Sequence, residues 1–104
     1  MQLQDKVGQM LMVGFHGFEA PDYLLEWLRQ GRAGGVILFA RNVESPAQLA
    51  RLTRSLHEAA KYPLLIGIDQ EGGTVARMRQ HFSESPGAMA LSSAVDGPAL
   101  AECQ

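Results

Sequence analysis

The chain has 104 residues, of which 46% are apolar, and its nine basic and eleven acidic side chains give a net charge of −2. This length suits one small domain, and the apolar content indicates a globular chain rather than a disordered one. The small negative charge gives no electrostatic case for binding nucleic acid or an anionic membrane, and no apolar run approaches the roughly 20 residues that cross a bilayer. The first residues, Asp5 and Lys6 among them, lack the apolar core of a secretion signal, so we expect a cytoplasmic protein.

The first third of the chain predicts a helix, a strand and a second helix. Apolar residues at helical spacing predict a helix over residues 3–10, and the next apolar run predicts a strand over 11–15. Pro21 suits the first turn of the second helix and Gly31 suits its end. The apolar stripe of this helix consists of Leu24, Leu25 and Leu28, and we expect Trp27 to pack rather than to serve as a ligand platform.

The middle of the chain repeats this alternation. A second strand is predicted over 36–40, with the polar residues 41–42 at its carboxyl end. Ser45 followed by Pro46 is typical of a helix start, because serine caps the first N–H groups and proline fits the first helical position. The apolar stripe of this helix continues to about Lys61.

A third strand is predicted over 64–69, and it runs directly into the sequence Asp-Gln-Glu-Gly-Gly of residues 69–73. The remainder is rich in turn residues at 83–87, continues through 88–94, and predicts a last helix near Pro98. No internal repeat, low-complexity tract or interdomain linker is visible, so we expect a single domain.

The order strand, helix, strand, helix, strand predicts an α/β fold with parallel strands. Three strands with two linking helices occur both in half of a doubly wound sheet and at the start of a (β/α)8 barrel. Periodicity does not decide between them, but a closed barrel needs about 250 residues. A chain of 104 residues does not close one.

Asp69 and Glu71 form the most informative pair, because ligands in α/β folds bind at the carboxyl ends of the strands. If the strand continued, the two carboxylates would lie on one side, roughly 6–7 Å apart along the chain. Glycosidases use two carboxylates at separations of this order, about 5 Å or about 6.5–9.5 Å. Acids in a polar turn are nevertheless more often solvated or capping, so the pair alone leaves both interpretations open.

The other candidate residues give weaker signals. The histidines at 16, 57 and 81 show no ligand spacing, and the single Cys103 completes neither a zinc site nor a disulfide. His16 follows the first strand and could line a site, whereas His57 is expected on an exposed helix face. Gly72-Gly73 lacks the Lys-Ser/Thr ending of a phosphate loop. Arg77 and Arg79 could attract an anion, but pairing with acids or solvent is commoner.

Several segments occur together in the order found in one enzyme family. They are residues 7–15 (Val-Gly-Gln-Met-Leu-Met-Val-Gly-Phe), 35–39 (Gly-Val-Ile-Leu-Phe), 41–43 (Arg-Asn-Val), 45–49 (Ser-Pro-x-Gln-Leu), 68–73 (Ile-Asp-Gln-Glu-Gly-Gly) and 85–91 (Ser-Pro-Gly-Ala-Met-Ala-Leu). With these segments the chain resembles the amino-terminal part of glycoside hydrolase family 3, most closely its bacterial β-N-acetylhexosaminidase branch. The resemblance covers almost the whole chain.

The resemblance implies a TIM-type (β/α)8 barrel, of which residues 1–104 would be a single partial domain with about three βα units, the amino-terminal third. It also implies a retaining mechanism in which the aspartate at the position of Asp69 holds hydroxyls of the terminal sugar. A carboxylate suits this role because charge-assisted hydrogen bonds are the stronger kind. Glu71 would brace the loop, and Thr74 replaces the arginine that usually follows the two glycines.

No catalytic residue is assigned, because the family's nucleophile, acid/base group and Lys-His motif lie beyond Gln104. The implied activity is hydrolysis of terminal β-linked N-acetylglucosamine, as in recycling of cell-wall muropeptides, with no cofactor or metal. The alternatives are a β-glucosidase within the family and a non-catalytic, truncated βα module. We expect the 104-residue chain alone to be inactive and to self-associate through open sheet edges.

Overall fold

The computed structural model describes residues 1–72 and 75–76. Within them the elements are α1 (Leu3–Gly8), β1 (Met12–Val13), α2 (Asp22–Arg29), β2 (Gly35–Leu38), a 3-10 turn η1 (Ala40–Asn42), α3 (Pro46–Ala59), β3 (Leu65–Ile68), β4 (Gln70–Gly72) and β5 (Val75–Ala76). The predictions for residues 77–104, including the last helix, Cys103, His81 and the arginines at 77 and 79, lie outside the described residues, as does Thr74.

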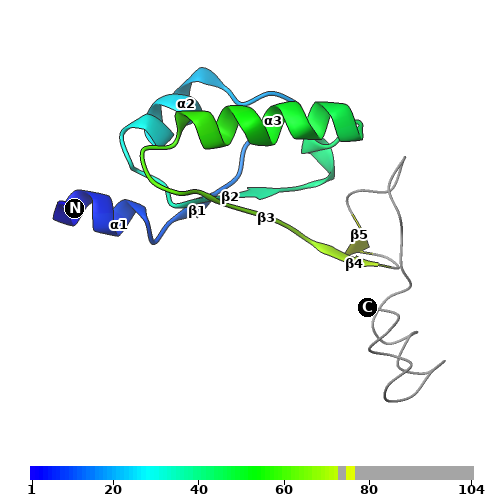
Figure 1. Ribbon diagram of the computed structural model, residues 1–104. Helices are drawn as coiled ribbons and strands as arrows, with labels where there is room; N and C mark the ends of the chain where they lie inside the picture. Colours follow the sequence, from blue (N-terminus) through cyan, green and yellow to red (C-terminus); the bar gives the residue numbers. More distant parts are fainter. Residues whose placement is uncertain (73–74, 77–104) are drawn as a thin grey trace, which may run out of the picture.

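Three parallel strands form the sheet, in the order β1-β2-β3. Figure 1 shows α2 and α3 side by side on one face of this sheet, with α1 at the amino end of the chain. The predicted α/β alternation with parallel strands is therefore confirmed. Strands joined by helices on one face follow from crossover connections, which return each strand parallel to the one before it.

The strands are shorter than predicted because loop side chains take over their hydrogen bonds. β1 covers Met12–Val13 instead of 11–15, since the carbonyl of Phe15 accepts from two side chains rather than from a neighbouring strand. β2 ends at Leu38 because the N–H of Phe39 donates to the side chain of Asn42, which closes η1.

The helices match the predictions more closely. Ser45 caps α3 by accepting from the N–H of Gln48 at 3.1 Å, and Pro46 occupies the first helical position. Gly31, with φ of +73°, follows the end of α2 in the left-handed conformation that glycine adopts most easily. α1 ends at Gly8, two residues earlier than expected, because the N–H groups of Met10 and Leu11 bond three residues back and tighten the last turn.

The core lies between the helices and the sheet. Alternate residues of β2, Val36 and Leu38, are buried against α2 and α3, and Ile66 and Ile68 of β3 pack beside them. The remaining buried apolar residues are Phe15, Leu24, Leu28, Ala33, Leu52, Leu56 and Leu64. This is the pattern of a sheet whose one face is covered by helices.

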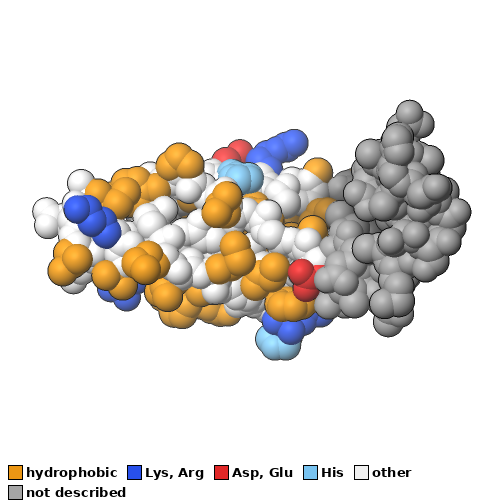
Figure 2. All heavy atoms as spheres, turned by 90° about the horizontal axis from the view of Figure 1, so that it is seen from below, with side chains coloured by type: hydrophobic (Ala, Val, Ile, Leu, Met, Phe, Trp, Pro, Cys, Tyr) orange, Lys and Arg blue, Asp and Glu red, His pale blue; other side chains and the backbone are white. Residues whose placement is uncertain are grey.

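The opposite side of the sheet, here named the open face, carries the other alternate residues: Met12, Gly35, Ile37, Leu65 and Gly67. On this face, large side chains lie over the glycines of neighbouring strands. A Cβ built on Gly35 would meet the side chain of Met12, and one built on Gly67 would meet the side chains of Met12 and Ile37. Figure 2 looks onto the molecule from the side away from α2 and α3 and shows hydrophobic side chains spread across it. Leu65 is 71% exposed there.

β4 and β5 form a separate antiparallel ribbon, with Gln70 opposite Ala76 and Gly72 opposite Val75. The sequence did not predict these two strands. Both are only two or three residues long, and such lengths produce no recognisable alternation. Gln70 follows Asp69 directly, so the chain leaves the parallel sheet at the residue for which a ligand role is predicted.

Candidate functional site

The carboxyl ends of the three parallel strands meet at one edge of the sheet, and Asp69 lies there. β2 and β3 are in register from Gly35 opposite Leu65 to Leu38 opposite Ile68. Phe39 and Asp69 are therefore the next residues of two neighbouring strands. Asp69 is exposed and takes part in an interaction within the structure. Its backbone position is the one that the α/β alternation predicted.

Asn42 fixes the loops beside this edge. Its side chain is fully buried, and its Nδ2 donates to the carbonyl oxygens of Phe15 at 3.1 Å and Gly17 at 2.9 Å. Its Oδ1 accepts from the N–H of Phe39 at 2.9 Å. Both polar atoms of this buried amide are thus paired, and the loop after β1 is tied to the end of β2.

Gln48, in the first turn of α3, continues this network and is only 4% exposed. Its Nε2 donates to the carbonyls of Phe18 and Asn42, both at 2.9 Å, and its Oε1 accepts from the N–H of Glu44 at 2.8 Å. The two side chains, here named the amide brace, hold the loops after β1 and β2 and the start of α3 as one unit.

Arg41 places a positive charge at the same edge. Its Nε donates to the carbonyl of Phe15 at 2.9 Å, and its guanidinium carbon lies 5.0 Å from the ring centre of Phe39. A Cβ built on Gly14 would lie 3.6 Å from Nη2 of Arg41 and 3.7 Å from Ile37, which is on the open face. The guanidinium therefore lies at the open-face side of the loops, one strand away from Asp69.

The other predicted site residues that the structure describes lie on several different elements. Glu71 belongs to β4, and its side chain is outside the described part of the chain, so its bracing role stays a prediction. His57 is exposed on α3, as predicted, and His16 is exposed after β1. Trp27 is 40% exposed and packs edge-to-face on Tyr23 with ring centres 5.2 Å apart. Among residues 1–72, no group of three metal-ligating side chains comes together.

One cavity of about 710 Å³ lies away from Asp69. It lies between the loop after β1 and the outer sides of α2 and α3, and its lining includes Phe18, Leu25, Glu44 and Arg51. Because it is on the helix side rather than on the open face, we assign the candidate site from strand topology and not from cavity size.

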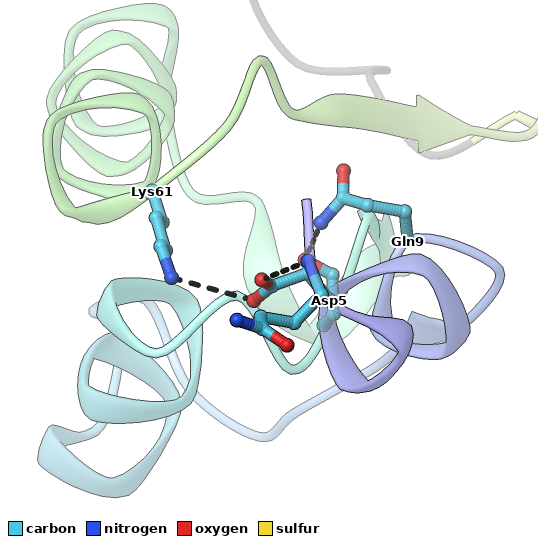
Figure 3. A network of polar contacts seen from close by, with 5 residues as sticks. Asp5, Gln9 and Lys61 are labelled. Carbon is cyan, nitrogen blue, oxygen red and sulfur yellow. Dashed lines mark hydrogen bonds and ion pairs between the residues drawn. The ribbon is translucent and has the colours of Figure 1, made fainter.

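A second polar network lies at the amino end of the strands (Figure 3). Asp5 of α1, 7% exposed, accepts from the N–H of Gln2 at 3.2 Å and from Nζ of Lys61 at 3.4 Å. Burial alone would raise the pKa of Asp5, but hydrogen bonds from Tyr62, Gln2 and Lys61, together with the Lys61 charge, hold its pKa below the ordinary 3.8. The hydrogen bond and the charge of Asp5 raise the pKa of Lys61 above 10.5.

The polar group around Asp5 is assigned to stability rather than to chemistry. In barrel-type α/β folds, polar residues at the amino ends of the strands serve stability, and those at the carboxyl ends serve chemistry. Gln9 adds a long hydrogen bond of 3.5 Å to the carbonyl of Ala33 at the same end.

In the part of the chain that the structure describes, no helix is long and apolar enough to span a membrane.

The comparisons with known proteins agree with this geometry. The family model for the glycosyl hydrolase family 3 N terminal domain matches residues 2–103. The chain therefore belongs to glycoside hydrolase family 3, which confirms the predicted resemblance. The three parallel strands with helices on one face are part of an α/β fold of the TIM-barrel type, which settles the choice that periodicity left open.

The relatives are named as hexosaminidases. A beta-hexosaminidase of Vibrio cholerae is 45% identical over 86 residues, covering 83% of this chain and 26% of the relative. A family 3 beta-N-acetylglucosaminidase from Paenibacillus sp. superimposes with a TM-score of 0.86 at 44% identity, covering 92% of this chain and 19% of that one. NagZ from Neisseria gonorrhoeae, solved in complex with N-trifluoroacetyl-D-glucosamine, superimposes with a TM-score of 0.74 at 30% identity, covering 80% of this chain and 24% of that one. The chain thus spans about a quarter of the length of the curated relatives that it matches.

Sequence reasoning missed the amide brace. Asn42 was predicted only to follow the second strand, and Gln48 entered only as a member of a matching segment, so neither was predicted to be buried. Asn42 lies in the turn η1 after β2, where irregular backbone must find hydrogen-bond partners, but its position in the sequence does not show which partners it bonds.

Proposed function

We propose that this chain is part of a retaining glycoside hydrolase that removes terminal β-linked N-acetylglucosamine. The observation that carries the proposal is the position of Asp69 at the carboxyl end of β3 in a family 3 domain. The relatives named beta-hexosaminidase and beta-N-acetylglucosaminidase support the substrate class, as does the N-acylated glucosamine bound in the Neisseria gonorrhoeae structure. A cytoplasmic role in recycling cell-wall muropeptides is part of the same proposal.

In this proposal Asp69 accepts hydrogen bonds from hydroxyls of the terminal sugar and is neither nucleophile nor acid/base. An ionised carboxylate offers two oxygens and no donor, so it pairs with two hydroxyl groups at once. Hydrogen bonds to sugar hydroxyls that strengthen in the transition state lower the barrier as well as KM. The proposal assigns neither the nucleophile nor the acid/base group to a residue of this chain.

The test is Asp69→Ala in a full-length protein that carries this segment. We expect kcat/KM for an aryl β-N-acetylglucosaminide to fall about 100-fold or more, which corresponds to roughly 3 kcal/mol of transition-state stabilisation. The melting temperature should stay within a few degrees, because the side chain is exposed. Glu58→Ala, which removes an exposed acid from α3, is the matched control and should leave both values unchanged.

Two results would contradict the proposal. Unchanged kinetics in Asp69→Ala would remove this residue from the sugar site. Preference of the parent protein for an aryl β-glucoside over the N-acetylated substrate would favour the β-glucosidase alternative within the family.

A further inference from the structure

We propose that the amide brace, Asn42 and Gln48, positions the sugar site at Asp69. This inference rests on the proposed function and assigns a role to two residues that touch no substrate. Their side chains link the loop after β1, the end of β2 and the first turn of α3 through six hydrogen bonds of 2.8–3.1 Å to backbone groups.

The first argument is that each polar side-chain atom of the brace has a hydrogen-bond partner. Burying an amide costs free energy unless each of its polar atoms is paired, and Asn42 is 0% and Gln48 4% exposed. Both side chains bond backbone carbonyls and N–H groups that no strand partner reaches. A network of this kind permits one arrangement of the two loops and no sliding between them.

The second argument is that the brace fixes two residues beside Asp69. Phe39, whose N–H is held by Asn42, is the residue next to Asp69 across the strand register. Arg41 precedes Asn42 and donates to the same carbonyl, that of Phe15, so the brace also fixes where its guanidinium lies. A displacement of either loop would therefore move Phe39 and Arg41 relative to Asp69.

The third argument is location. The brace is at the carboxyl ends of β1 and β2, where barrel enzymes place chemistry. At the opposite end, the amide of Gln9 makes one longer bond of 3.5 Å to a backbone carbonyl. A site residue must be held within about 0.5 Å by its surroundings, and a displacement of about 1 Å can cost about 100-fold in rate.

The experiment compares Asn42→Asp with its parent in a full-length protein that carries this segment. Aspartate keeps the acceptor for the N–H of Phe39 but at neutral pH has no donor for the carbonyls of Phe15 and Gly17. We expect kcat/KM for an aryl β-N-acetylglucosaminide to fall at least about tenfold at pH 7. Burial and the two carbonyls favour the protonated carboxyl, whereas the charge of Arg41, which bonds the same Phe15 carbonyl, favours the ionised one. Part of the loss relative to the parent should be recovered as the pH falls, because the protonated carboxyl donates one hydrogen bond again.

Gln48→Glu tests the second amide in the same way, and two variants serve as controls. Gln9→Met removes an amide-to-carbonyl bond at the other end of the strands, and Leu56→Ala opens the core under α3 and lowers the melting temperature. All assays are run well below the lowest melting temperature. Both controls should keep the parental kcat/KM and its pH profile.

Each outcome decides something. A parental kcat/KM at every pH in Asn42→Asp and Gln48→Glu would overturn the positioning role while leaving the proposed function intact. An equal loss in Leu56→Ala would show that any destabilisation lowers activity and would also overturn it. A parent without glycosidase activity would refute the proposed function itself.

Discussion

Asp5 is a carboxylate of α1 that is nearly buried and is held by groups from a distant part of the chain, Lys61 and Tyr62. The ion pair with Lys61 joins residues 56 positions apart, at 3.4 Å, and the Lys61 side chain is 46% exposed. A pair in which one partner is nearly half exposed contributes little by itself. The hydrogen bonds to Asp5, rather than the charge pair, therefore account for most of its role in docking α1.

This arrangement predicts how stability depends on pH. Because folding lowers the pKa of Asp5, its contribution is fully present above the unfolded value of 3.8 and is lost as the pH falls through the lower, folded value. Because folding raises the pKa of Lys61, its contribution is present below 10.5 and is lost as the pH rises through the higher, folded value. Between these limits the contribution of the pair is constant.

We expect Asp5→Asn to lower the melting temperature of a full-length protein that carries this segment at pH 7, and the difference from the parent to shrink below pH 3.8. Melting curves from pH 2.5 to 8 measure it. Asp22→Asn, an exposed acid in the first turn of α2, is the control and should show no such pH-dependent difference. A difference for Asp5→Asn that is independent of pH would mean that the charge of the carboxylate contributes nothing to the loss.

At the scale of elements, local signals set the helices and distant contacts set the strand ends. The start of α3 follows from Ser45 and Pro46, and the end of α2 from Gly31, because caps and left-handed glycines act within a few residues. The short extent of β1 was not predictable. It depends on Arg41 and Asn42, which reach the carbonyl of Phe15 from 26 and 27 residues away.

The candidate site likewise has one part that the sequence predicts and one part that it does not. Asp69 was predictable because the strand period and the rule for parallel sheets place it at a carboxyl end. The amide brace was not, because a polar side chain that bonds distant backbone leaves no period in the sequence. Only the fold shows that Asn42 and Gln48 are buried.

The contact between α1 and the loop before β2 depends on two glycines. A Cβ on Gly8 would overlap the carbonyl oxygen of Gly31 and lie 2.9 Å from Cα of Arg32, and one on Gly34 would overlap the backbone of Gln9. Both obstacles are backbone atoms, which cannot rotate away as a side chain can. Alanine at either position must therefore push α1 from the loop.

We expect Gly8→Ala and Gly34→Ala to lower the free energy of unfolding by about 1–3 kcal/mol, the usual range for overpacking. Gly34→Ala should be the more severe, because helix propensity favours alanine at Gly8 by up to about 1 kcal/mol. Urea unfolding of a full-length protein that carries this segment measures both. Gly14→Ala, whose Cβ would meet atoms no closer than 3.6 Å, is the matched control, and an equal loss there would contradict the argument from close approach.

At the scale of the whole molecule, the described residues present a sheet with one face covered and one face open. α2 and α3 bury Val36 and Leu38, while Met12 and Leu65 on the open face are 49% and 71% exposed. Within the described part, β1 and β3 each pair with a strand on one side only. Unpaired backbone groups beside exposed apolar side chains are a template for pairing with another chain.

We therefore expect the 104-residue chain, produced by itself, to associate through β3 and the open face. Size-exclusion chromatography with light scattering should give masses above the monomer mass of 11.3 kDa, increasing with concentration. Leu65→Lys places a charge on the β3 edge and should shift the population toward monomer, because lysine on an edge strand opposes pairing. Tyr23→Lys removes an apolar side chain that is 51% exposed on α2 and should leave the association unchanged. A parent chain that is monomeric at all concentrations and melts cooperatively would contradict this expectation, and equal effects of the two lysines would place the contact elsewhere than on β3.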